Sequence, residues 1–209
     1  MSQRIWIPLV LLAAGLAGIG IGRMLLAPDQ EPVAAIELES GTWLSPPRSL
    51  PGFALVDQDG RRAGPEALQG RWTLVFFGFT HCPEACPATL AMLGNLRREL
   101  SATLPAGKVP SVLLVSVDPE RDSPAVLKAY LAGFGPGFTG LTGEPAAVQA
   151  FATALGVPYR KIPMDGDYMM DHGTAIMLVN PRGQLAGLFA APHDAGALSR
   201  DVRRSVGAG

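Results

Sequence analysis

Four apolar runs along the chain predict buried strands. They contain no charged side chain and cover residues 53–56, 72–77, 111–117 and 175–179. Apolar runs of this length, bounded by turn residues, are typical of strands covered on both faces of a sheet. A turn at residues 180–183 and a further run at 184–189 predict a β-hairpin after the last of them.

Helix start and stop signals lie between these runs. Ser123 followed by Pro124 is an N-cap with proline at the first helical position, and Gly156 is typical of the residue just past a helix end. Helices are therefore expected over residues 88–100, 124–131, 145–155 and 194–206. The order of hairpin, βαβ units, hairpin and helix predicts a thioredoxin-like α/β fold, with a central mixed sheet and helices on both faces.

Residues 5–22 form an uncharged apolar segment between two arginines. With residues 24–27 it reaches the roughly 20 residues that span a bilayer. A cleaved signal peptide is the alternative, but its apolar core is shorter, about 7–15 residues, and Pro28 would follow the best cleavage site. We therefore expect an N-terminal transmembrane helix within residues 1–28. A short tail inside and a domain outside is the ordinary single-pass arrangement, which would put the soluble domain on the periplasmic side of the membrane.

The rest of the chain divides into a linker and one domain. Residues 29–50 are rich in proline and serine and are expected to form an extended linker, followed by the thioredoxin-like domain at residues 51–209. The net charge of −1 and the lack of any lysine or arginine run indicate that nucleic acid is not a partner.

The chain has two cysteines, Cys82 and Cys86, between the strand 72–77 and the helix 88–100. They are able to form a disulfide, act as a redox pair or hold a soft metal. Residues four apart on a helix have Cβ atoms about 5–6 Å apart, which suits two sulfurs on one ion. A disulfide prefers a shorter Cβ separation of about 3.5–4.5 Å. The helix N-terminus is also expected to favour the thiolate form of both cysteines.

A third metal ligand is expected from one of the chain's three histidines. His81 adjoins Cys82, and neighbouring residues in a turn rarely converge on one ion, while His193 is expected to be a solvated loop residue. His172 lies in a predicted loop before the strand 175–179. In a thioredoxin-like sheet this loop ends beside the central strand, so His172 is the candidate ligand. Asp118, after the strand 111–117, either orients a ligand, accepts a proton or caps its turn; these readings stay open.

Three segments together resemble the Sco (SenC) family: residues 78–87, residues 116–124, and Asp171-His172 before a strand. The resemblance covers about residues 53–206 and implies a thioredoxin-fold copper protein whose metal ligands are the matching Cys82, Cys86 and His172. It also implies a role in building the dinuclear copper centre of cytochrome c oxidase. The implied partner is the copper-bearing oxidase subunit, with other copper carriers as further candidates. The chain departs from the family pattern at Gly173, where Ser or Thr is usual, and at Met177, where an aromatic residue is usual.

Two functions follow from these residues. The first is a copper metallochaperone, because two thiolates and an imidazole suit copper, whereas structural zinc would require a fourth protein ligand. The alternative is a thiol–disulfide oxidoreductase, with Cys82 and Cys86 as catalytic residues that keep partner cysteines reduced. A thiol peroxidase fits worst, because the hydroxyl residue that family needs three positions before its reactive cysteine is replaced by Phe79 or Pro83. Whether the chain has catalytic activity of its own is left open by the sequence.

Overall fold

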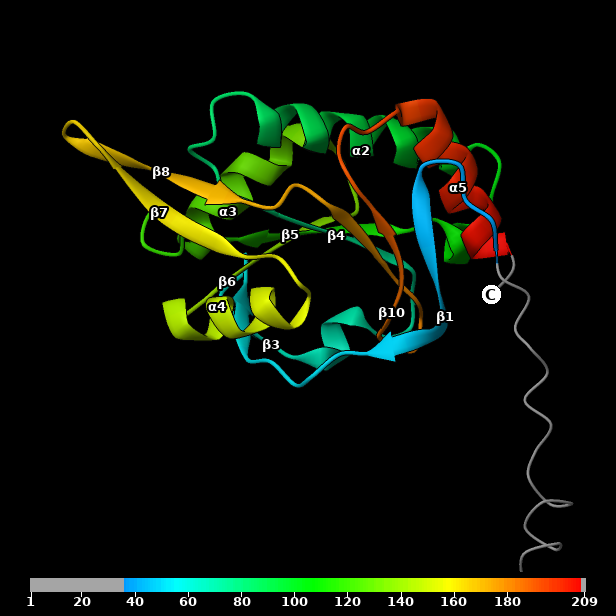
Figure 1. Cartoon of the computed structure of the whole chain (residues 1–209), viewed down its shortest axis with the longest axis horizontal. Helices are drawn as coiled ribbons and strands as arrows, with labels where there is room; N and C mark the ends of the chain where they lie inside the picture. The colour runs from blue at the N-terminus through cyan, green and yellow to red at the C-terminus, as the bar shows by residue number, and fades with distance from the viewer. Residues whose placement is uncertain (1–35, 208–209) are drawn as a thin grey trace, which may run out of the picture. The chain divides into compact units, whose positions relative to one another are not determined.

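The computed structural model describes residues 36–207, and their centre is an eight-stranded mixed sheet (Figure 1). The strand order is β1-β10-β9-β4-β5-β6-β2-β3. The bounds are β1 Gly41–Ser49, β2 Leu55–Asp57, β3 Arg62–Ala63, β4 Thr73–Gly78, β5 Ser111–Ser116, β6 Phe138–Thr142, β9 Ile176–Val179 and β10 Gln184–Phe189. The central strands β4, β5 and β6 are parallel, and the other pairs are antiparallel.

Helices cover both faces of this sheet, as the sequence predicts. They are α2 Ala85–Ser101, α3 Pro124–Leu131, α4 Pro145–Ala154 and α5 Ala195–Gly207. The crossovers β4–α2–β5 and β5–α3–β6 move along the sheet in the same direction, so right-handed connections place α2 and α3 on one face. The helix α5 lies beside α2 on that face (Figure 1), where Ser199 donates a 2.7 Å hydrogen bond to Glu99. On the other face, Phe151 of α4 packs against Phe77 with ring centroids 6.0 Å apart.

The local signals read from the sequence act as expected at the helix ends. The Ser123 hydroxyl accepts a 3.3 Å hydrogen bond from the Val126 amide at the start of α3. Asp194 likewise accepts a 2.6 Å bond from the Ala197 amide of α5. Gly156, just after α4, has a φ of 75°, a conformation that glycine adopts without steric cost. The predicted hairpin is formed by β9 and β10.

The central strand β4 fixes the position of the cysteine segment. All six of its residues are buried. A Cβ atom on Gly78, its last residue, would lie 3.0 Å from the Phe76 ring and 3.1 Å from the Cys86 sulfur. Such separations are shorter than ordinary packing contacts, so glycine leaves the room that the Cys86 side chain fills.

Part of the predicted linker is wrong, because Gly41–Ser49 is strand β1 of the sheet. It pairs antiparallel with β10, and its register shifts between Trp43 and Arg48, where the chain has two prolines. Proline is tolerated in an edge strand but disrupts the alternating pattern by which strands are recognised. The buried carboxylate of Asp201 on α5 secures the segment before β1 by accepting bonds from the Glu39 and Ser40 amides, at 2.8 and 2.7 Å.

The expected transmembrane helix at residues 1–28 and the first part of the predicted linker, residues 29–35, lie outside the described residues. Within residues 36–207, no helix is long and apolar enough to cross a bilayer.

Replacing Asp201 with alanine is expected to destabilise the domain by about 2–4 kcal/mol, because it leaves two amides of the β1 lead-in without their charged acceptor. The free energy of unfolding from urea titration of residues 36–209 measures the effect. Glu39→Gln is the control, since it breaks only the exposed ion pair with Arg200 and should change the free energy of unfolding much less. Equal losses in the two variants would contradict the prediction.

Candidate metal centre

Cys82 and Cys86 lie at the start of α2, at the carboxyl end of β4. Cys86 is the second residue of the helix and is fully buried, whereas Cys82 lies in the preceding turn and is partly exposed. No side chain caps the helix from Glu84. The Cys82 sulfur instead accepts a 3.4 Å hydrogen bond from the Cys86 amide, one of the free donors of the first turn. Both cysteines are in the free thiol form.

His172 is not in a loop, as the sequence suggested, but is the last residue of a strand. Strands β7 (Tyr159–Met164) and β8 (Asp167–His172) form a separate two-stranded sheet, in which His172 pairs with Tyr159. The histidine Nε2 lies 3.7 Å from the Cys86 sulfur. The ring also packs edge-on against Phe79, with centroids 5.8 Å apart. The structure therefore brings Cys86 and His172 together, although they are 86 positions apart in the sequence.

The second nitrogen of His172 fixes which atom faces the sulfur. Nδ1 lies 3.0 Å from the carbonyl oxygen of Gly173. A carbonyl only accepts hydrogen bonds, so Nδ1 carries the proton in the neutral ring and Nε2 keeps a free lone pair. Metal-binding histidines usually have this arrangement, with the distant nitrogen held by a carbonyl or carboxylate. The ring is thus oriented to donate its lone pair toward Cys86.

Burial sets the charge of this pair. It raises the pKa of Cys86 to about 12 and lowers the pKa of His172 below its ordinary value. The expectation that the helix N-terminus makes Cys86 a thiolate is wrong for the metal-free protein, because loss of solvation outweighs the helix dipole. The pair is a neutral thiol beside a neutral imidazole. A bound cation would supply the charge that stabilises the thiolate, at the cost of releasing the thiol proton.

Solvent reaches the site from the side of Cys82. A depression of about 540 Å³ is lined by Cys82, His172, Met169 and Met170 among others. The other two histidines are engaged elsewhere: His81 contacts Thr80 Oγ1 at 3.1 Å, and His193 contacts the carbonyl of Thr174 at 2.9 Å. Met164, at the far end of the hairpin, is 57% exposed and does not line this depression.

The donor atoms fit a soft metal, although they do not yet surround one point. In the part of the chain that the structure describes, no three His, Cys, Asp or Glu side chains form a ready metal site. Cys86 and His172 are already in contact, and the Cys82 sulfur is directed at the helix amide. The ligand triad Cys82, Cys86 and His172 stays a prediction.

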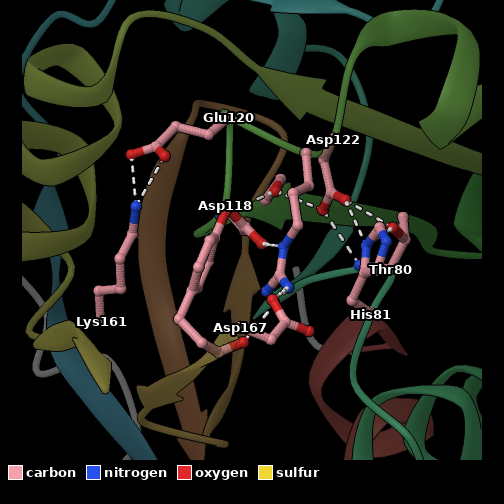
Figure 2. Close-up of polar contacts among 10 residues, drawn as sticks. Thr80, His81, Asp118, Glu120, Asp122, Lys161 and Asp167 are labelled. Atoms are coloured by element: carbon pink, nitrogen blue, oxygen red, sulfur yellow. Dashed lines mark hydrogen bonds and ion pairs between the residues drawn. The ribbon is translucent and has the colours of Figure 1, made fainter. Parts of the chain in front are cut away.

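A polar network lies beside the cysteine segment (Figure 2). Of its members, only Asp118 was singled out from the sequence. Asp118 is buried, and its two oxygens accept bonds from Arg121 at 2.5 Å and from the Tyr168 hydroxyl at 2.8 Å. Asp122 is buried as well and accepts bonds from Thr80. The available signal was Asp118, directly after the predicted strand 111–117, with Asp122 four positions further on. Their partners could not be assigned because Tyr168 is 50 positions from Asp118.

A comparison with known families gives one clear result. The family model SCO1/SenC matches residues 44–207. The chain belongs to the SCO1/SenC family.

Relatives and solved structures agree with this membership. The chain is 40% identical over 148 residues to a putative copper-binding protein of Stutzerimonas stutzeri, covering 69% of this chain and 71% of that protein. The copper-bound crystal structure of Arabidopsis thaliana ScoI has a TM-score of 0.70 and 32% identity, covering 75% of this chain and 97% of that one. BsSco, described as a Sco-family cytochrome c oxidase assembly protein with a disulfide switch, has a TM-score of 0.60 and 25% identity, covering 77% and 95%. The chain spans 46 to 75% of the length of its curated mitochondrial relatives.

The lowered pKa of His172 predicts an acid-sensitive metal-free protein. The unfolded chain binds a proton at the ordinary pKa of about 6.5, whereas the buried ring resists protonation, so stability should fall as the pH drops below that value. We expect the free energy of unfolding of the reduced, metal-free domain to decline between about pH 7 and pH 5, and less steeply in His172→Gln. His81→Gln serves as the exposed control and should keep the decline. The same slope in His172→Gln as in the native domain would contradict the assignment.

Proposed function

We propose that this protein is a copper metallochaperone that binds copper as cargo through Cys82, Cys86 and His172 and delivers it to the dinuclear copper centre of cytochrome c oxidase. The observation that carries the proposal is the 3.7 Å approach of the His172 Nε2 lone pair to the Cys86 sulfur, four residues after a second free cysteine. The names of the relatives support the metal, since they include a copper-binding protein and a Sco protein with copper bound. The oxidase role is supported by BsSco, which is described as an assembly protein of that enzyme.

The donor chemistry favours copper over the other common metals. Thiolate and imidazole are soft to borderline ligands that suit copper, and a structural zinc site would require a fourth protein ligand. With neutral His172, two thiolates give a Cu(I) site one negative charge and make a Cu(II) site neutral. Both oxidation states are therefore compatible with the three ligands.

Differences in burial suggest how the ion would be passed on. Cys86 and His172 are held by packing, whereas Cys82 is partly exposed and lines the open depression. A partner's sulfur or nitrogen would approach the ion from the Cys82 side, and Cys82 would be the first ligand to leave. This geometry suits transfer by stepwise ligand exchange. The proposed partner is the copper-bearing oxidase subunit, and other copper carriers would use the same face.

We place the domain on the periplasmic side of a membrane, anchored by a single transmembrane helix within residues 1–28. The support for this is the uncharged apolar segment at residues 5–22. The anchor would keep the domain beside a membrane-bound partner.

A thiol–disulfide oxidoreductase is the second candidate, favoured by the two free cysteines on one helix end. In that reaction Cys82 would be the attacking sulfur, because it is the exposed member of the pair. Cys86, with its pKa raised to about 12 by burial, would be the poorer nucleophile of the two and would act second, displacing the partner's sulfur from the mixed disulfide at Cys82. Both reactions use the same two sulfurs, so one protein is able to perform both.

Loss of any one ligand should weaken copper binding. We expect Cys82→Ser, Cys86→Ser and His172→Ala each to lower Cu(I) affinity at least about tenfold, equivalent to about 1.4 kcal/mol. Competition with a Cu(I) chelator and metal analysis of the reduced protein measure this. His81→Ala is the matched control, because it alters the residue beside Cys82 without removing a proposed ligand. Native stoichiometry and affinity in Cys86→Ser would refute the proposed site.

Copper binding and a Cys82–Cys86 disulfide should exclude each other, because both require the same sulfurs. Oxidising the copper-loaded protein is expected to release the metal in step with the loss of free thiols. Thiol titration and metal analysis of the same samples measure the two changes. Affinity should also fall with acid, because the thiol protons must leave before copper binds. Copper that stays bound after the disulfide has formed would contradict the prediction.

A further inference from the structure

The hairpin that carries His172 is not part of the main sheet. Strands β7 and β8 pair with each other and form their own two-stranded sheet. Besides the short connection from His172 to β9, the position of His172 relative to Cys86 therefore depends on side-chain contacts between this hairpin and the body of the domain. Within β8, Tyr168, Met170 and His172 share one face, because alternate residues of a strand point the same way. Met170, between the other two, is only 7% exposed, so this face is the one that packs on the domain.

Arg121 binds the hairpin at Tyr168. Its Nη1 donates to the carbonyl oxygen of Tyr168 at 3.2 Å and to the Asp167 carboxylate at 3.1 Å. Its guanidinium carbon lies 3.7 Å from the centroid of the Tyr168 ring, a close cation–π contact. One side chain thus contacts the backbone, the ring and the neighbouring carboxylate of this part of β8 (Figure 2 shows the surrounding contacts).

Asp118 contacts both Arg121 and Tyr168, so the three residues are bonded to one another. Its Oδ2 accepts from Arg121 Nε at 2.5 Å, and its Oδ1 accepts from the Tyr168 hydroxyl at 2.8 Å. The carboxylate is 1% exposed and the arginine side chain 17%, so solvent weakens these contacts little. Burial and the bond to Asp118 raise the pKa of Tyr168 to about 12, which keeps its hydroxyl a donor. The three mutually bonded residues Asp118, Arg121 and Tyr168 thus connect the turn after β5 to the hairpin.

The same turn also holds the cysteine segment. Asp122, which is fully buried, accepts bonds from the Thr80 amide at 3.0 Å and from the Thr80 hydroxyl at 2.5 Å. It accepts a third bond, at 2.6 Å, from the Ser116 hydroxyl at the end of β5. Thr80 is two residues before Cys82. One turn, residues 116–122, is therefore bonded to both segments that carry the proposed ligands.

We propose that residues 116–122 position the copper ligands, and that Arg121, through Asp118 and Tyr168, holds His172 against Cys86. Arg121 is a positioning residue and does not itself contact the metal. β8 is paired with β7 along its whole length, so a shift at Tyr168 would be passed along the strand to His172 at its end. The inference rests on the proposed function, since it concerns the geometry of that site.

A neighbouring contact provides a matched control. Lys161 of β7 lies over the same Tyr168 ring, with Nζ 4.1 Å from its centroid, and pairs with Glu120 of the same turn at 2.7 Å. Its side chain and that of Glu120 are 40% and 59% exposed. Exposed pairs of this kind contribute little to stability. Lys161→Gln therefore removes a cation from the same ring and turn without breaking the buried connection.

The test compares Arg121→Gln, Lys161→Gln, His172→Ala and the double variant Arg121→Gln/His172→Ala in the full chain. Cu(I) affinity is measured by chelator competition, and the histidine ligand by nitrogen hyperfine coupling in the electron paramagnetic resonance spectrum of the Cu(II) form. We expect Arg121→Gln to weaken affinity at least about fivefold, equivalent to about 1 kcal/mol, and to change the nitrogen signal. In the His172→Ala background it should add no further loss, because coupled residues are not additive. Lys161→Gln should match the native protein.

The outcomes separate this inference from the proposed function. Unchanged copper affinity in His172→Ala would overturn the proposed ligand set and the inference with it. Two results would overturn only the inference, provided that His172→Ala weakens binding. In the first, Arg121→Gln leaves the affinity and the nitrogen signal unchanged. In the second, Arg121→Gln causes the same loss of affinity in the native protein as in the His172→Ala variant. Should Arg121→Gln fail to fold, Tyr168→Phe replaces it, because that change removes only the hydroxyl bond to Asp118. It should give a smaller loss in the same direction, and native affinity and nitrogen signal in Tyr168→Phe would overturn the inference.

Discussion

The burial of the Cys86 sulfur between the end of β4 and the ring of His172 is the constraint on which this site depends. Gly78 makes room for it, because a Cβ atom at that position would lie only 3.1 Å from the sulfur, closer than an ordinary packing contact. Burial then keeps the metal-free pair neutral, with the pKa of Cys86 raised and that of His172 lowered. A buried sulfur beside an imidazole lone pair is stabilised as a thiolate only when a cation arrives. The same packing that raises the pKa of Cys86 would therefore place its sulfur ready for the proposed metal.

The two cysteines have different roles because they differ in exposure. Cys86 is packed into the core, and Cys82 lies at the surface of the helix end beside an open depression. The proposed metal carrier would need a site stable enough to hold its ion and open enough to release it. One sulfur in the core and one at the surface would meet both needs within five residues of sequence. The same asymmetry would serve a dithiol reaction, in which the exposed sulfur attacks and the buried one resolves.

The comparison with known families and the local geometry answer different questions about this protein. The match over residues 44–207 shows the family, and the thioredoxin-like sheet with helices on both faces agrees with it. The contact of Cys86 with His172 is a property of this chain's own fold. The buried carboxylates of Asp118 and Asp122 lie beside that contact, and together they join the cysteine turn to the histidine hairpin through one short segment. Under the proposed function, these polar contacts, which are protected from solvent, would maintain the geometry of the ligands.

The sequence by itself determined the elements whose signals are local. The apolar runs of β4, β5 and β9 and the Ser123 and Asp194 caps each depend on residues a few positions apart, and the structure has them where they were expected. The run at residues 53–56 only partly overlaps strand β2, and Cys82 lies in the turn before α2 rather than on the helix with Cys86. Strand β1 was missed because two prolines hide its pattern, although pairing with β10 along the sheet edge accommodates them. The hairpin position of His172, the loss of solvation at Cys86 and the partners of Asp118 were decided only by tertiary structure. The contact of Cys86 with His172 and the bond from Tyr168 to Asp118 join residues 86 and 50 positions apart, and no local pattern of polarity records which distant side chain will cover a given atom.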